Sequence, residues 1–141
     1  MDLQLEGKKV LVTGSTAGIG FATARALAGE AASVVINGRG QARVDAAMRE
    51  IRKLHPSANV SGVASDVSNA AGCAKLVQTV ASVDILINNM GIFEPKPFQE
   101  IPDEDWLHFF EANVMSGGSG LYTLAGVCTD SHFISETRSF G

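Results

Sequence analysis

The chain begins with short apolar runs that alternate with amphipathic segments, up to about residue 116. The apolar runs have the length of strands and are predicted at residues 9–13, 33–37, 59–64 and 83–89. In the segments between them, apolar residues recur every three or four positions. This spacing predicts helices at residues 21–30 and 41–54, and two more that begin near Ser68 and Asp103.

The order of these elements indicates the fold class. Helical crossovers join parallel strands, and right-handed crossovers place helices on both faces of the sheet. Continuous β-branched runs such as Val34-Val35-Ile36 are typical of strands buried on both faces of a parallel sheet. We therefore predict an α/β fold with a doubly wound parallel sheet of the Rossmann type over residues 1–116.

The pattern changes after Ser116. Gly117-Gly118-Ser119-Gly120 stands where the last helix would continue, and each glycine inside a helix costs about 1 kcal/mol relative to alanine. Residues 117–141 show no sustained period. We interpret them as a separate tail, which is either a linker to a second half or a stretch unrelated to the fold, as a truncation or shifted reading frame would produce.

Composition excludes several classes of protein. Of the 141 residues, 45% are hydrophobic and 18% charged, which suits one globular domain. The net charge of −4 argues against nucleic acid as a partner, and no apolar run reaches the ~18 residues of a membrane span. The N-terminus does not have the pattern of a signal peptide. Two separated cysteines, Cys73 and Cys128, favour a cytoplasmic protein without disulfides or a metal site.

A glycine-rich segment, Thr13-Gly14-Ser15-Thr16-Ala17-Gly18-Ile19-Gly20, follows the first predicted strand and opens the first helix. In this context glycines allow a tight turn, close approach of the backbone to a pyrophosphate, and close helix–strand packing. The N–H groups and positive dipole end of the helix then hold the anion. We predict that the dinucleotide is bound by Thr13, Gly14, Ser15, Thr16, Gly18, Ile19 and Gly20.

The spacing Thr-Gly-x-x-x-Gly-x-Gly resembles that of the short-chain dehydrogenase/reductase family. Three later segments resemble the family in the same order: Asp66-Val67, Asn88-Asn89-Met90-Gly91 and Asn113-Val114. The resemblance covers residues 8–116. It implies that this chain holds four of the usual seven strands, so that the fourth strand would be an uncovered hydrophobic edge.

The resemblance also implies roles for these later residues. Asp66 and Val67 would contact the adenine ring, Asn88, Asn89 and Gly91 would bind the cofactor, and Asn113 would belong to the catalytic proton relay. Other interpretations remain open. Asp66 could cap a helix, Asn88 and Gly91 could only form a turn, and Asn113 could lie on an exposed helix face.

The end of the second strand bears on the choice of cofactor. A fold of this kind that binds NAD usually has an acidic residue there, which accepts hydrogen bonds from the ribose hydroxyls. Here the segment reads Asn37-Gly38-Arg39, and the guanidinium of Arg39 could bind a 2′-phosphate through two hydrogen bonds. The sequence therefore favours NADP(H) over NAD(H), the alternative being an Arg39 that only faces solvent.

The residues that catalyse the family's reaction are not recognised in this sequence. The family uses a serine on the fifth strand and a tyrosine followed four residues later by a lysine, whereas Tyr122 is followed by Gly126. Phe133-Ile134-Ser135 resembles the serine segment only faintly. His55, His108 and His132 are expected on the surface or at helix caps.

Three hypotheses follow from the sequence. The first is an NAD(P)(H)-dependent oxidoreductase for a small alcohol or carbonyl substrate, here without its catalytic Ser and Tyr-x-x-x-Lys. The second is a non-catalytic NADP(H)-binding module, and the third is an inactive translation product. The resemblance also implies homo-oligomers, which the family forms through the helices that follow the fourth and fifth strands.

Overall fold

A computed structural model describes residues 3–91, 96–110 and 128–135. Strands and helices alternate as β1 (Lys9–Val12), α1 (Gly18–Gly29), β2 (Ser33–Gly38), α2 (Gln41–Leu54), β3 (Val60–Ala64), α3 (Ala70–Val80) and β4 (Val83–Asn88). A short 3-10 helix, η1 (Phe98–Glu100), then precedes α4 (Asp103–Phe110) and β5 (Cys128–Ser135). The alternation predicted from the hydrophobic pattern is confirmed.

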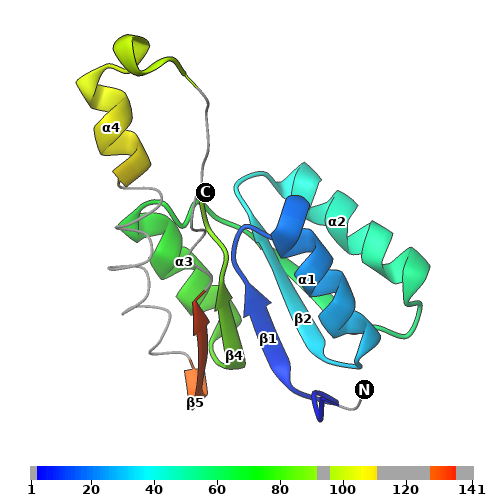
Figure 1. Ribbon diagram of the computed structural model, residues 1–141. Coiled ribbons are helices and arrows are strands. Elements are labelled where there is room, and N and C mark those ends of the chain that lie inside the picture. The colour runs from blue at the N-terminus through cyan, green and yellow to red at the C-terminus, as the bar shows by residue number, and fades with distance from the viewer. Residues whose placement is uncertain (1–2, 92–95, 111–127, 136–141) are drawn as a thin grey trace.

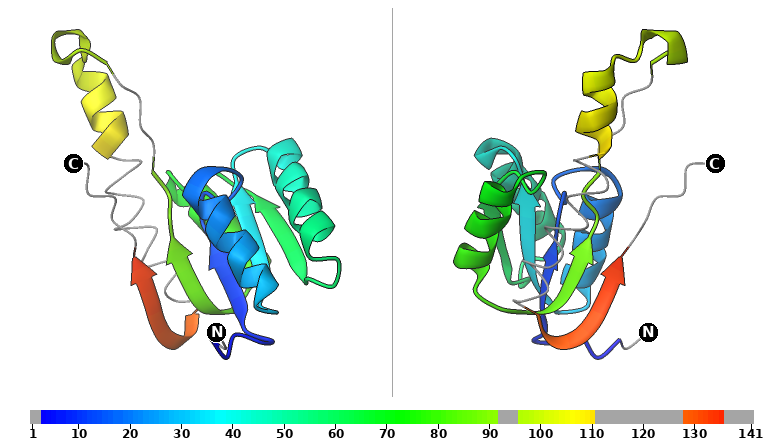
Figure 2. Two further views of the ribbon diagram at one scale, coloured as in Figure 1. Left: turned by 45° about the vertical axis from the view of Figure 1, so that its right-hand side comes forward. Right: turned by 90° about the vertical axis from the view of Figure 1, so that its left-hand side faces the viewer.

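The strands form one sheet in the order β3-β2-β1-β4-β5, and every pairing is parallel. Val10 of β1 lies between Val34 of β2 and Ile85 of β4, so β1 is central. Figures 1 and 2 show α1 and α2 on one face of the sheet and α3 on the other. The doubly wound α/β fold of the Rossmann type is confirmed.

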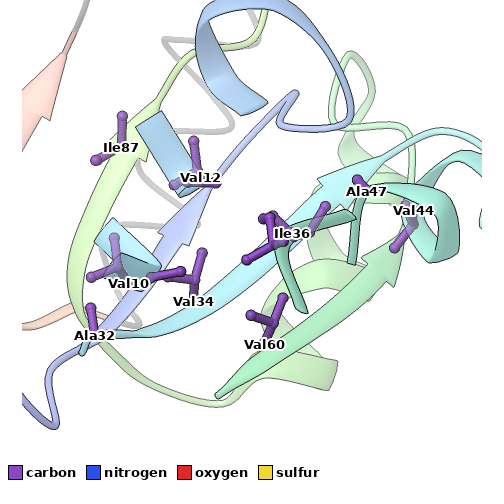
Figure 3. Close-up of a cluster of buried hydrophobic side chains, with 12 residues drawn as sticks. Val10, Val12, Ala32, Val34, Ile36, Val44, Ala47, Val60 and Ile87 are labelled. Carbon is purple, nitrogen blue, oxygen red and sulfur yellow. The ribbon is translucent and has the colours of Figure 1, made fainter. Parts of the chain in front are cut away.

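Each face of the sheet has its own hydrophobic core because side chains alternate along a strand. Val10 and Val12 point toward α1 and α2, in the cluster that Figure 3 shows, whereas Leu11 points toward α3. All three are fully buried, and burial of such a side chain contributes roughly 1.5–3 kcal/mol. These two cores hold the carboxyl ends of the strands in place.

The predicted uncovered edge at β4 is wrong, because β5 pairs with β4 in parallel. Leu86 lies opposite Phe133 and Asn88 opposite Ser135, so the described sheet has five strands, one more than expected. On the side of β4 that faces away from β1, backbone hydrogen bonding favours pairing with an added strand, and β5 supplies that strand. The predicted boundary at residue 116 falls within 111–127, outside the described residues.

No helix in the described ranges combines the length and the apolar character that crossing a membrane requires.

Candidate functional site

The glycine-rich loop lies where the strand order of the sheet reverses. From β1 the chain passes to β2 and β3 on one side, and then to β4 on the other. Open α/β sheets bind ligands at the carboxyl ends of the strands beside such a reversal. The loop that connects β1 to α1 is at this position (Figure 1).

The three glycines of the loop meet different steric demands. Gly14 and Gly18 have φ of 59° and 60°, in the left-handed region that glycine adopts without strain. A Cβ at Gly20 would collide with Asn89 Nδ2 and lie 2.5 Å from the carbonyl oxygen of Gly14. A Cβ at Gly18 would meet nothing within 4 Å. Gly20 therefore allows close packing, and Gly18 borders open space.

The amino end of α1 presents hydrogen-bond donors that the described residues do not use. Ala17 is the N-cap and cannot accept a hydrogen bond through its side chain, and the first turn has no acidic residue. Among the described residues, no acceptor is found for the backbone N–H groups of residues 16–20. With the positive end of the helix dipole, these donors form an anion-binding position.

The amino end of α3 differs from that of α1 because a capping side chain accepts a hydrogen bond from one of its first N–H groups. The side chain of Asn69 accepts a hydrogen bond of 2.8 Å from the N–H of Gly72. The helix that the sequence predicts to begin near Ser68 is therefore capped by Asn69. Ser68 donates instead to Asp66 Oδ1, through its N–H at 3.0 Å and its hydroxyl at 2.6 Å.

The structure brings Thr13, Asn88 and Asn89 together beside the loop. The hydroxyl of Thr13 donates to Asn88 Oδ1 over 3.2 Å and accepts from the N–H of Asn89 over 3.0 Å. The side chain of Asn89 donates to the carbonyl oxygen of Gly14 over 3.1 Å. These bonds connect the end of β4 to the loop. Thr13 and Ser15, the two loop residues on its inner side, are fully buried.

Asp66 and Val67 lie just beyond β3, where the chain turns into α3. Val67 is buried, whereas Asp66 is half-buried and does not cap α3. A Cβ at Gly72 would overlap the carbonyl oxygen of Asp66, so this turn packs closely on α3. Burial, and to a lesser extent the Asp66 carboxylate, raises the pKa of the Cys73 thiol, which keeps this side chain uncharged.

The remaining predicted residues lie at the rim or outside the described part of the chain. Arg39 is exposed directly after β2, and Gly38 before it packs against the methyl group of Thr16. Ile19 is 46% exposed on the first turn of α1, and Gly91 is exposed after β4. The catalytic candidate Asn113 falls outside the described residues, as does Tyr122.

Two features of the site were not singled out by the sequence pattern. They are Asn37 near the end of β2 and Ser65 just after β3, both buried polar residues. The Asn37 side chain bonds to Ser65 and to the Gly14 N–H of the loop. The one available signal was a polar residue at the end of the apolar run in β2. Within the described ranges, no three His, Cys, Asp or Glu side chains are grouped so that they could hold a metal ion.

Comparison with known proteins relates this geometry to a family. The sequence model of the family described as short chain dehydrogenase matches residues 8–125. The uncharacterized oxidoreductase YvaG of Bacillus subtilis is 49% identical over 117 residues, which cover 83% of this chain and 44% of YvaG. The D-beta-hydroxybutyrate dehydrogenase of Cupriavidus necator is 38% identical over 116 residues, which cover 79% of this chain and 44% of that enzyme.

Solved structures agree with the sequence matches. The L-sorbose reductase of Gluconobacter frateurii, crystallised with NADPH and L-sorbose, superposes with a TM-score of 0.80 at 32% identity. The match covers 89% of this chain and 49% of the reductase. The chain thus spans about half the length of the relatives it matches.

Proposed function

The chain belongs to the short-chain dehydrogenase/reductase family, and from that premise we propose that it is the NADP(H)-binding half of an oxidoreductase for a small alcohol or ketone. When bound, NADPH supplies the hydride for reduction of a carbonyl. The observation that carries the proposal is the row of N–H groups without acceptors at residues 16–20, beside the reversal in strand order. The partly buried hydrogen bonds of Thr13, Asn88 and Asn89 support it by fixing the loop.

The described residues fit the parts of a dinucleotide. The pyrophosphate would lie against the N–H groups of residues 16–20, where the missing Cβ of Gly18 leaves space. The adenine ring would lie beyond β3, near Val67. Asp66 Oδ1 is occupied by Ser68, but Oδ2 has no partner among the described residues and could accept from the adenine amino group.

The preference for NADP(H) depends on Arg39. Arg39 is exposed directly after β2, and residues 37–41 contain no carboxylate that would repel a 2′-phosphate. Gly38 brings this turn against Thr16, so Arg39 lies on the same side of the sheet edge as the phosphate-binding loop. The NADPH found in the L-sorbose reductase crystal supports the same choice.

The test is the affinity of the Arg39→Ala variant for the two cofactors. We expect NADPH to bind roughly 10- to 100-fold more weakly, because a charge-assisted hydrogen bond is lost, and NADH to change by less than about threefold. Arg49→Ala is the matched control, since Arg49 is exposed farther along α2. Equal weakening of NADPH and NADH binding would contradict the assignment.

A second candidate is a module that binds NADP(H) without turnover. It is favoured by the sequence around Tyr122, which has Gly126 where the family has a lysine. An assay of NADPH oxidation with simple carbonyl compounds tests whether residues 1–141 catalyse turnover by themselves. We expect binding without turnover from residues 1–141, and turnover that depends on Tyr122 would contradict this expectation.

The proposal extends to the surface of α4. Trp106, Leu107 and Phe110 are 53%, 63% and 51% exposed, and large apolar residues grouped on a surface often mark an interface. We propose that this helix contributes to a homo-oligomer of the complete protein.

A further inference from the structure

Asn37 is a buried side chain at the end of β2 whose hydrogen-bonding groups are occupied by two different segments. The residue is 1% exposed. Its Nδ2 donates toward β3, to the carbonyl oxygens of Val63 and Ser65 at 3.2 and 3.3 Å and to the Ser65 hydroxyl at 3.0 Å. Its Oδ1 accepts from the N–H of Gly14 at 3.3 Å. One amide group therefore joins the glycine loop to the end of β3.

The backbone of Asn37 binds the next residue of the loop. Its carbonyl oxygen accepts from the N–H of Ser15 at 2.8 Å, and its own N–H donates to the Ser15 hydroxyl at 2.9 Å. That hydroxyl donates in turn to the carbonyl oxygen of Val12 at 2.7 Å. The N–H groups of Gly14 and Ser15 are thus turned inward, and those without acceptors begin with Thr16.

We propose that Asn37 is a positioning residue that sets the distance between the pyrophosphate and adenosine parts of the cofactor site. It holds the loop on one side and Ser65 on the other, and Ser65 directly precedes Asp66. Arg39, the proposed partner of the 2′-phosphate, is two residues beyond Asn37. Asn37 is buried and bonded to protein atoms, so it acts through these neighbours and does not touch the cofactor.

A positioning role and a purely structural role predict different changes in the affinities for a long and a short ligand. The inference rests on the proposed NADP(H) site. NADPH must contact the loop and the end of β3 together, whereas 2′-AMP contacts only the adenosine part. A shifted loop should therefore weaken NADPH binding and spare 2′-AMP, because the second ligand does not span the two parts. A loss of stability alone would leave both affinities of the folded protein unchanged.

The experiment measures both dissociation constants by calorimetry, at a temperature where thermal melts show each variant to be folded. For Asn37→Ser we expect NADPH binding to weaken roughly 10- to 100-fold and 2′-AMP binding by less than about threefold. Ser65→Ala removes one of the acceptors of the Asn37 amide, just after β3, and should weaken NADPH binding about 3- to 10-fold. If Asn37→Ser does not fold, the NADPH and 2′-AMP affinities of this milder variant are compared instead.

Asn59→Ala is the matched control. The Asn59 side chain also links the segment of β3 to β2, through the Ser33 hydroxyl at 3.0 Å, but at the amino ends of these two strands, away from the loop. We expect it to leave both affinities unchanged. Equal weakening of the two ligands, or no change in NADPH binding for the folded variants, would overturn the role of Asn37. Failure of the unmodified chain to bind NADPH would instead overturn the proposed function.

Discussion

A substitution at the N-cap of α1 should change stability and cofactor binding in opposite directions. Ala17 is exposed and has an extended backbone, with φ of −157° and ψ of 171°, which suits a capping side chain. In the Ala17→Asp variant, the new carboxylate would accept hydrogen bonds from the N–H groups of Ile19 or Gly20, which have no acceptor among the described residues. These are donors that we assign to the pyrophosphate.

The two effects can be estimated separately. A new N-cap stabilises by about 1 kcal/mol, and a negative charge at the helix start adds roughly 0.3–1 kcal/mol. The same carboxylate would lie next to a bound phosphate. Two unit charges about 4 Å apart near a protein surface repel by about 4 kcal/mol at an effective dielectric constant of about 20. NADPH binding should therefore weaken by a factor on the order of 1000.

Denaturant unfolding and NADPH titration measure the two quantities. Ala17→Ser is the control, because an uncharged cap should give a similar gain in stability with a much smaller loss of affinity. The loss caused by Asp should shrink at high salt, which screens the repulsion. Unchanged NADPH affinity in Ala17→Asp would refute the proposed location of the pyrophosphate at the start of α1. A lower free energy of unfolding in this variant would refute the interpretation that the first N–H groups of α1 lack a capping acceptor.

Two further predictions concern the backbone strain at Ala81 and the burial of the Cys73 thiol. Ala81 has φ of 64° and ψ of −63°, a strained γ-turn conformation, so Ala81→Gly should raise the free energy of unfolding by about 1 kcal/mol. The same change at the exposed Ala46 inside α2 should lower it by about 1 kcal/mol in the same denaturant assay, and equal effects at both sites would contradict the strain. Because burial and a neighbouring carboxylate raise the pKa of Cys73 in the folded protein, the unfolded chain loses the thiol proton first. The free energy of unfolding should therefore fall above about pH 8.5 more steeply in the unmodified protein than in Cys73→Ala, whereas parallel pH curves would exclude this contribution.

The elements of the core could be predicted because their signals are local. Runs such as the one around Val34 and the helical spacing of residues 41–54 depend only on near neighbours, and α2 has the predicted bounds. β5 has no such signal, since its sequence lacks both a continuous apolar run and a regular alternation. Its place follows from its pairing with β4, a contact between distant segments that no local pattern reveals.

The roles of individual side chains in the site could not be predicted in the same way. Some depend on contacts between residues that are distant in sequence, and others on a choice between residues with similar propensities. Ser68 and Asn69 are both good N-caps, and the choice between them follows from the bond of Ser68 to Asp66. Asn37 binds residues that lie 23 and 28 positions away in sequence. Sequence alone shows it as a polar residue in a buried strand, without showing which groups it satisfies.

The inward hydrogen bonds of the loop also bear on how tightly a cofactor can bind. Ordering the backbone of a mobile residue costs about 1–2 kcal/mol, so a loop that became ordered only on binding would lose much of its affinity. Here Gly14 and Ser15 are held by Asn37, and Asn89 holds the carbonyl oxygen of Gly14. All of these hydrogen bonds join protein atoms to one another. We therefore expect folding to orient the donors of residues 16–20, so that the free energy of cofactor binding would not have to offset the ordering of the loop.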